Sequence, residues 1–117
     1  MTAENRPQKE KLLFICTANS ERSPTAEAMF QESSRYEASS AGISAMSARV
    51  VDQELINRAD KIFVMSELED GHLSFLKSRF DLSGKDVYSL EIPDMFMRGS
   101  PALKSMLREK LSSYLEM

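Results

Sequence analysis

The sequence predicts an α/β fold, a three-layer sandwich in which a four-stranded parallel sheet is flanked by helices. Short apolar runs bounded by charged or turn residues recur along the chain, and such runs are typical of buried strands. Between them lie segments whose apolar residues are three and four positions apart, as in amphipathic helices. Strands that alternate with helices form βαβ units and hence a parallel sheet. At 117 residues, the chain can form one domain with a modest core.

The first half of the chain contains two predicted strand–helix units. Residues 1–10 are polar and are expected to form a disordered tail, with one domain over residues 11–117. Ser23 suits the N-cap and Pro24 the first turn of a helix. The elements expected here are a strand over Lys11–Cys16, a helix over Ser23–Ser33, a strand near Tyr36–Ser40, a loop over Ala41–Ser47 and a helix over Val50–Ala59.

The second half repeats this pattern. Ser66 suits an N-cap, and the acidic Glu67, Glu69 and Asp70 favour a helix N-terminus, where the helix dipole stabilises negative charge. The elements expected here are a strand over Ile62–Met65, a helix over Glu67–Phe80, a turn at Ser83-Gly84, a strand over Val87–Leu90, a loop over Glu91–Gly99 and a last helix that begins at Ser100-Pro101. The sites of parallel sheets lie beyond the carboxyl ends of their strands.

The most informative segment joins the first strand to the first helix. It places the only cysteine, Cys16, at the end of the strand, with Arg22 six positions later. A strand–loop–helix unit directs backbone N–H groups toward one point, where an oxyanion binds. Arg22 can grip two phosphate oxygens, and the same positive field favours the Cys16 thiolate. The pattern predicts a nucleophile beside a phosphate clamp, although spacing alone also fits a buried, inert cysteine and a surface arginine.

Residues 13–27 resemble the opening of the low-molecular-weight protein tyrosine phosphatase family. Three further segments match that family in order: Ser40-Ala41-Gly42, Ala59–Met65 and Ile92-Pro93-Asp94. Together they span Lys11 to about Phe96, and they are most similar to a short bacterial branch. The resemblance implies a phosphatase phosphate-binding loop after the first strand, a phosphocysteine on Cys16, a clamp at Arg22 and a general acid and base at Asp94.

The resemblance also implies how the substrate is bound. Backbone N–H groups of the loop hold the phosphate oxygens, Asn19 braces the loop, and Ser23 donates a hydrogen bond to the Cys16 sulfur. Phe96 either forms a wall beside the substrate or packs in the core. The residues expected to bind substrate are Thr17, Ala18, Asn19, Ser20, Glu21, Ser23 and Phe96. No metal and no other cofactor is expected.

The sequence departs from the family pattern at several positions. Ala18 stands where the family usually has glycine, and Glu21 stands where many relatives carry a second cysteine. The proline that commonly follows the general acid is missing after Asp94. His72 is the only histidine; it has no partner nearby in the sequence and is expected to be structural or solvent-exposed.

Composition restricts the possible partners. The net charge of −3 and the pI of about 5.2 argue against nucleic acid and acidic membranes as partners. One cysteine excludes a disulfide framework, and no apolar stretch approaches the ~20 residues of a membrane span. We expect a cytoplasmic enzyme whose substrate is a phosphotyrosine protein or a small aryl phosphate, with inorganic phosphate as product. An arsenate reductase-like enzyme that uses an external thiol and a non-catalytic phosphate-binding module remain as alternatives.

Overall fold

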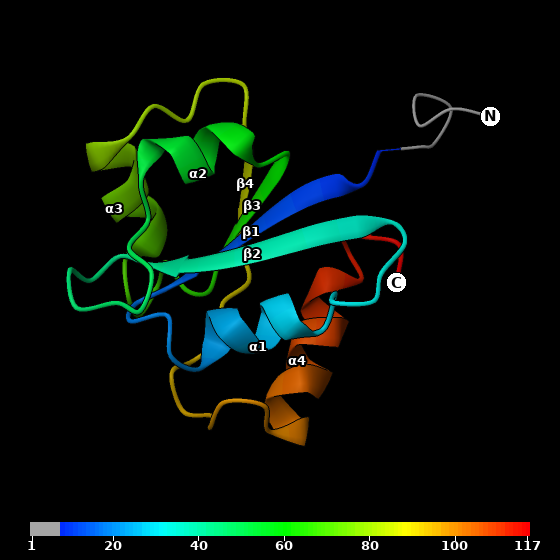
Figure 1. Cartoon of the computed structure of the whole chain (residues 1–117). Coiled ribbons are helices and arrows are strands. Elements are labelled where there is room, and N and C mark those ends of the chain that lie inside the picture. Colours follow the sequence, from blue (N-terminus) through cyan, green and yellow to red (C-terminus); the bar gives the residue numbers. More distant parts are fainter. Residues whose placement is uncertain (1–7) are drawn as a thin grey trace.

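The computed structural model describes residues 8–117 and confirms the predicted three-layer α/β arrangement (Figure 1). Four parallel strands form one sheet in the order β2-β1-β3-β4. The strands are β1 (Glu10–Cys16), β2 (Tyr36–Gly42), β3 (Lys61–Val64) and β4 (Asp86–Ser89). The helices are α1 (Arg22–Ala28), α2 (Gln53–Arg58), α3 (His72–Arg79) and α4 (Pro101–Leu111). Helices α1 and α4 cover one face of the sheet, and α2 and α3 cover the other.

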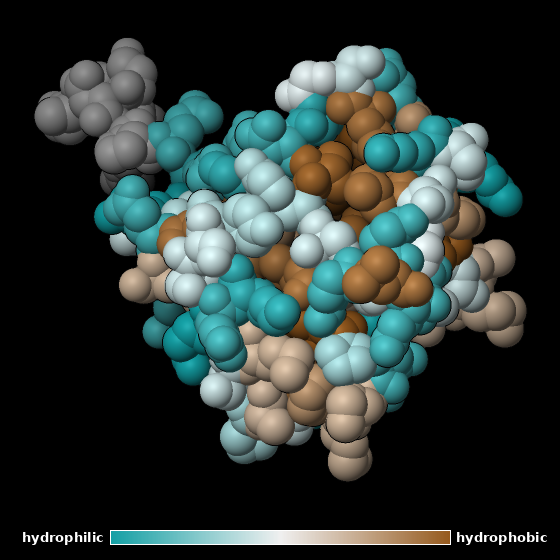
Figure 2. Space-filling model, turned by 180° about the vertical axis from the view of Figure 1, so that it is seen from behind, coloured by the Kyte–Doolittle hydropathy of each residue, from teal (hydrophilic) through white to brown (hydrophobic). Residues whose placement is uncertain are grey.

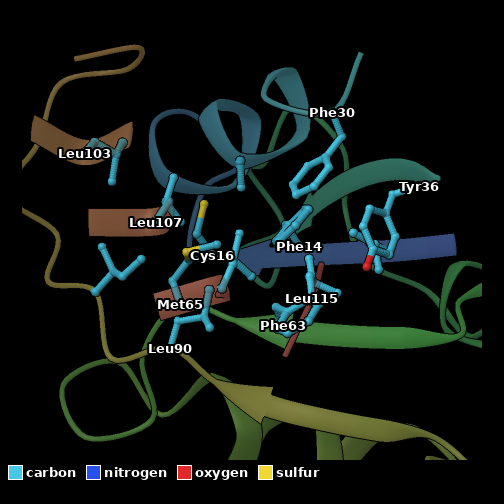
Figure 3. Packing of buried hydrophobic residues seen from close by; sticks show 14 residues of the cluster. Phe14, Cys16, Phe30, Tyr36, Phe63, Met65, Leu90, Leu103, Leu107 and Leu115 are labelled. Carbon is cyan, nitrogen blue, oxygen red and sulfur yellow. The ribbon is translucent and has the colours of Figure 1, made fainter. Parts of the chain in front are cut away.

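Strand β1 is central and separates two apolar clusters. Because side chains alternate along a strand, Leu12, Phe14 and Cys16 belong to the cluster on the side of α1 and α4, whereas Leu13 and Ile15 belong to the other. Figure 3 shows the first cluster, in which the Phe14 ring stacks on the ring of Phe63 with centroids 5.5 Å apart. Cys16 is therefore fixed at the end of a strand that is buried from Leu12 onward.

The N-terminal expectations require two corrections. Residues 1–7 of the predicted tail lie outside the described residues, and Glu10 belongs to β1 because its N–H donates to the Arg35 carbonyl and its carboxylate pairs with Lys61. Helix α1 begins at Arg22, so Ser23 lies in its first turn and is not the N-cap. The hydroxyl of Ser23 contacts the Cys16 sulfur instead.

The predicted third helix is also shorter than expected. It was predicted over Glu67–Phe80, but α3 begins at His72, after Gly71 with a φ of 65°. The preceding residues form a loop because the N–H groups of Glu67 and Leu68 donate to the distant carboxylate of Glu91. Local sequence does not reveal a hydrogen-bond acceptor that another loop supplies, so the helix start was predicted too early.

The loops after the four strands meet at one edge of the sheet. The N–H groups of Ile43 and Ser44 donate to the carbonyls of Cys16 and Thr17, which joins the loop after β2 to the loop after β1. The Ile92 N–H donates to the Met65 carbonyl over 2.7 Å, which joins the loops after β3 and β4. Parallel topology therefore assembles four loops around Cys16.

Several apolar side chains are exposed on these loops. Figure 2 shows the molecule from behind, and on that rear face apolar side chains lie between hydrophilic ones along the middle. Four of the most exposed large apolar side chains in residues 8–117 lie on loops that follow strands: Met46, Leu68, Met95 and Met97. None of the helices in this part of the chain has the length and apolar content needed to span a membrane.

Candidate active site

The Cys16 thiol is the centre of the site. It is buried, and its Sγ lies 2.9 Å from the hydroxyl oxygen of Ser23. That oxygen accepts a hydrogen bond from the Asn19 side-chain amide at 2.9 Å. The hydroxyl proton of Ser23 then has two acceptors, the sulfur at 2.9 Å and the Ala41 carbonyl at 3.4 Å, and the sulfur is the nearer one. A hydroxyl donor stabilises a thiolate more than a thiol, because hydrogen bonds to a charged group are the stronger ones.

Asn19 braces the loop from within. Its backbone is left-handed, with a φ of 55°, a conformation that asparagine adopts more readily than most residues. Its Nδ2 also donates to the Ser40 hydroxyl at 3.0 Å, and that hydroxyl donates to the Glu27 carboxylate. The chain of contacts ties the loop to both β2 and α1. Asn19 and Glu91 are the non-glycine residues with positive φ in residues 8–117, so Ala18 carries no left-handed strain in place of the usual glycine.

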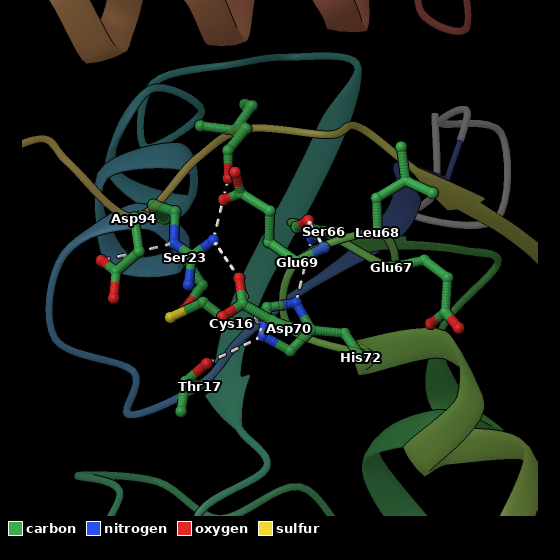
Figure 4. Close-up of polar contacts among 12 residues, drawn as sticks. Cys16, Thr17, Ser23, Ser66, Glu67, Leu68, Glu69, Asp70, His72 and Asp94 are labelled. Carbon is green, nitrogen blue, oxygen red and sulfur yellow. Dashed lines mark hydrogen bonds and ion pairs between the residues drawn. The ribbon is translucent and has the colours of Figure 1, made fainter.

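Arg22 is buried and fixed on two sides, which rules out the surface arginine of the alternative interpretation. Its Nη1 donates to the Asp70 carboxylate at 2.9 Å and to the Ile92 carbonyl at 2.8 Å. Its Nε lies 3.8 Å from a carboxylate oxygen of Asp94, so Asp70 and Asp94 lie on opposite sides of the guanidinium (Figure 4). A guanidinium has five N–H donors, and two of them are used by Asp70 and Ile92.

The remaining predicted residues lie around this centre. Asp94 is exposed, with 55% of its side chain accessible, whereas Phe96 is partly buried and packs against the core cluster beside α1 and α4. Ser20 is exposed, and its hydroxyl donates to the half-buried Glu21 carboxylate at 3.1 Å. The structure thus brings Asp94 to the Arg22 guanidinium and directs Phe96 toward the core.

Sequence reasoning missed the contribution of His72. Its ring is fully buried; Nδ1 accepts the Ser66 N–H at 3.0 Å, and Nε2 lies 2.9 Å from the Thr17 hydroxyl. Since Nδ1 is an acceptor, the ring proton is on Nε2 and is donated to Thr17. Burial, together with the nearby charge of Arg22, lowers the pKa of His72 to about 4, so the ring is neutral at pH 7.

The contribution of Asp70 was also missed. Asp70 and His72 lie 48 and 55 positions from their partners Arg22 and Thr17, so no local pattern connects them. One signal was available in the sequence: both residues flank Gly71, in a polar segment directly after a buried strand of a parallel sheet. Such segments supply site residues.

The fold and the site together indicate which kind of chemistry the protein can perform. A buried thiol ends a parallel strand, a hydroxyl lies beside it, and a buried guanidinium comes from the first residue of the helix that follows. This arrangement is suited to nucleophilic attack on a bound oxyanion ester. No cluster of three or more His, Cys, Asp or Glu side chains within residues 8–117 is arranged to hold a metal ion.

The family model described as low molecular weight phosphotyrosine protein phosphatase matches residues 11–87, and the chain belongs to this family. The match includes Cys16, Arg22, Asp70 and His72 but ends before Asp94. The family and the fold support a phosphatase. A comparison with curated protein sequences gave no match.

Solved structures share the fold at low sequence identity. The low molecular weight protein tyrosine phosphatase SP-PTP of Streptococcus pyogenes is 15% identical with a TM-score of 0.68, and the match covers 92% of this chain and 94% of that one. The tyrosine phosphatase Wzb of Escherichia coli K30, solved with phosphate, is 18% identical with a TM-score of 0.69, over 92% and 96%. The thioredoxin-dependent arsenate reductase of Corynebacterium glutamicum is 16% identical with a TM-score of 0.63, over 95% and 63%.

Proposed function

We propose that this protein is a phosphomonoester hydrolase, specifically a protein tyrosine phosphatase that works through a phosphocysteine intermediate. The observation that carries the proposal is the pairing of the Cys16 sulfur with the Ser23 hydroxyl at 2.9 Å, next to the buried Arg22 at the start of α1. A nucleophile, a group that stabilises it as an anion and a phosphate clamp are the parts that this chemistry requires.

In the first step, the Cys16 thiolate attacks phosphorus in line with the ester oxygen. The sulfur–phosphorus bond forms as the phosphorus–oxygen bond breaks, and protonated Asp94 gives its proton to the leaving phenolate. Arg22 and the backbone N–H groups of residues 17–22 stabilise the charge on the equatorial oxygens. Asp94 is suited to this role because it is exposed at the mouth of the site, next to Arg22.

In the second step, water attacks the phosphocysteine. The Asp94 carboxylate takes a proton from that water, which restores its protonated form, and the sulfur leaves as a thiolate. The Ser23 hydroxyl stabilises this leaving thiolate, and inorganic phosphate is released. The cycle returns Cys16 and Asp94 to their starting states and needs no cofactor.

The substrate is a phosphotyrosine protein or a small aryl phosphate. Exposed apolar side chains on the loops around the site, at Met46, Leu68, Met95 and Met97, support a polypeptide substrate because they offer contact area beside the phosphorylated residue. We further propose a cytoplasmic location, because a reducing compartment preserves a thiolate nucleophile.

Two alternatives come from specific observations. The fold is shared with a thioredoxin-dependent arsenate reductase, and with one cysteine such an enzyme would depend wholly on an external thiol. A non-catalytic phosphate-binding module is favoured by Glu21 at the loop and by the absence of proline after Asp94.

The experiment that separates these functions measures the turnover of p-nitrophenyl phosphate and of a phosphotyrosine peptide, and the reduction of arsenate with a thiol reductant. We expect turnover of both phosphate esters, its complete loss in Cys16→Ser, and no arsenate reduction. Thiol-dependent arsenate reduction without ester hydrolysis would indicate the reductase, and phosphate binding without either reaction would indicate the binding module.

A further inference from the structure

Glu91 occupies an unusual position between two loops of the site. Its backbone has a φ of 55°, a conformation that non-glycine residues adopt only when the surroundings hold them there. Its Oε1 accepts hydrogen bonds from the Ser66 hydroxyl at 3.1 Å and the Leu68 N–H at 3.2 Å. Its Oε2 accepts from the Glu67 N–H at 3.0 Å and from the Ser89 hydroxyl. One carboxylate thus fastens the start of the loop after β3 to the end of β4.

This carboxylate is ionised at neutral pH. Burial alone would raise the pKa of Glu91, but the hydrogen bonds from Ser89 and from the N–H groups of Glu67 and Leu68 outweigh burial and lower it. At neutral pH the ionised carboxylate of Glu91 therefore accepts all four hydrogen bonds.

Both supports of the Arg22 guanidinium are connected to Glu91. Its carboxylate fastens residues 66–68, and two residues further along the same loop lies Asp70, which accepts from Nη1 of Arg22 at 2.9 Å (Figure 4). The residue that follows Glu91 is Ile92, whose carbonyl accepts from the same Nη1 at 2.8 Å. Neither support lies on the loop that carries Arg22, so the direction of the guanidinium depends on how the two other loops are joined.

We propose that Glu91 is a positioning residue for the phosphate clamp: it joins the loops that carry Asp70 and Ile92 and thereby fixes Arg22 for the oxyanion. Glu91 itself acts only through these groups. The inference rests on the proposed function of the site as a phosphate-ester site, and it adds a residue that directs the clamp.

The test replaces Glu91 with glutamine, which has nearly the same shape. In either orientation, the glutamine NH₂ group faces one serine hydroxyl and one backbone N–H, of Glu67 or Leu68. The serine hydroxyl can turn and accept a hydrogen bond from the NH₂ group. The backbone N–H can only donate, so it loses its acceptor. We expect the dissociation constant for inorganic phosphate, measured by calorimetry at neutral pH, to rise about tenfold in Glu91→Gln. Glu67→Gln is the matched control, because the Glu67 carboxylate bonds Ser74 of α3, and it should stay within twofold of wild type.

A double-mutant cycle with Asp70→Asn tests the route of the effect. If Glu91 acts through Asp70, Glu91→Gln should weaken phosphate binding in the Asp70→Asn background by less than threefold. A merely structural role would lower the fraction of active protein without changing the dissociation constant. If Glu91→Gln does not fold, Ser89→Ala removes one donor to Glu91 and one acceptor of the Glu67 N–H, and it should weaken binding about threefold.

Wild-type affinity in folded Glu91→Gln, or effects of Glu91→Gln and Asp70→Asn that multiply independently, would overturn the inference. Failure of the proposed function is a separate result, because it would be seen as wild-type protein that binds phosphate but hydrolyses no phosphate ester. A wild-type protein that binds no phosphate at all would overturn both.

Discussion

At the scale of single residues, contacts with neighbouring groups hold the main side chains of the site in place. The Arg22 guanidinium is held by Asp70 and by the Ile92 carbonyl, and the Cys16 sulfur lies against Ser23. The geometry explains why a buried arginine is tolerated: a charge in the interior is stable when it is paired and hydrogen-bonded. It also means that a substitution with the same charge does not preserve the site.

Replacing Arg22 with lysine should reduce kcat/KM for p-nitrophenyl phosphate by about 100-fold or more. An ammonium cannot form the planar fork that matches two phosphate oxygens, and one lost oxyanion donor costs about 3–4 kcal/mol in transition-state stabilisation. Steady-state kinetics measure this directly. Arg108→Lys, on the exposed face of α4, is the matched control and should behave as wild type. An Arg22→Lys enzyme within a few-fold of wild type would show that Arg22 is not the clamp.

Replacing Asp94 with asparagine should slow phosphotyrosine turnover much more than p-nitrophenyl phosphate turnover. Proton donation matters for a poor leaving group such as the tyrosine phenolate and little for nitrophenolate, which is already stable as an anion. The comparison of kcat/KM for the two substrates measures this difference, because kcat/KM reports the formation of the phosphocysteine and not its shared hydrolysis. The limb of the pH–rate profile that reports the proton donor should also flatten. An equal loss of kcat/KM for both substrates would mean that Asp94 has another role.

The neutral state of His72 makes the stability of the protein depend on acid. Its pKa is about 4 in the folded protein and about 6.5 when unfolded, so the unfolded state binds the extra proton first as the pH falls. The stabilisation is complete above pH ~6.5 and is lost as the pH falls toward ~4, by roughly 3 kcal/mol in total. Thermal midpoints measured from pH 7.5 to 4.5 should fall more steeply for wild type than for His72→Gln. Parallel curves would show that the ring does not titrate with folding.

At the scale of elements, the sequence predicted the strands better than the helix starts. Buried strands such as β1 and β3 are visible as short apolar runs, because both faces of each strand are covered. The start of α1 was misplaced by one residue because the Ser23 hydroxyl bonds the Cys16 sulfur and caps nothing. The start of α3 was misplaced by five residues because Glu91, from another loop, takes the N–H groups of Glu67 and Leu68.

The same reasoning separates the parts of the site that could be predicted from those that could not. Cys16 and Arg22 lie at the two ends of one short loop, so their spacing can be read directly from the sequence. Asp70, His72 and Glu91 reach the site through the order of the strands in the sheet, and that order is not encoded in any local pattern. The local sequence therefore pointed to Cys16 and Arg22 as candidates but missed the residues that contact Arg22 and its loop.

The end of β2 lies close against the loop between β1 and α1 at Gly42. A Cβ added at Gly42 would lie 2.7 Å from the Thr17 carbonyl oxygen and 2.9 Å from the Asn19 nitrogen, both backbone atoms of the loop between β1 and α1. We expect Gly42→Ala to displace that loop and to lower kcat/KM for p-nitrophenyl phosphate at least tenfold, because misplaced catalytic groups lose rate steeply. Gly84→Ala is the control: its Cβ meets nothing within 4 Å, but its φ of 75° costs stability, so it should melt earlier and keep full activity. An active Gly42→Ala enzyme would show that the loop tolerates the shift.

At the scale of the whole molecule, four parallel strands bring their carboxyl ends to one edge, and the site lies at that edge. Cys16 is the last residue of β1, Asp70 lies in the loop after β3 and Asp94 in the loop after β4. Because the chain has a single cysteine, a covalent intermediate on sulfur can form at one position only. The mass of the intact chain therefore reports on the mechanism.

The proposed mechanism is tested most directly by trapping the phosphocysteine. Protein mixed with excess aryl phosphate and quenched in acid within milliseconds should gain the mass of one phosphoryl group, and peptide mapping should place it on Cys16. Asp94→Asn should accumulate more of this adduct with p-nitrophenyl phosphate, because water attack is slowed more than sulfur attack, and Cys16→Ser should show no turnover and no adduct. Steady hydrolysis by Cys16→Ser, or an adduct on any other residue, would contradict the mechanism.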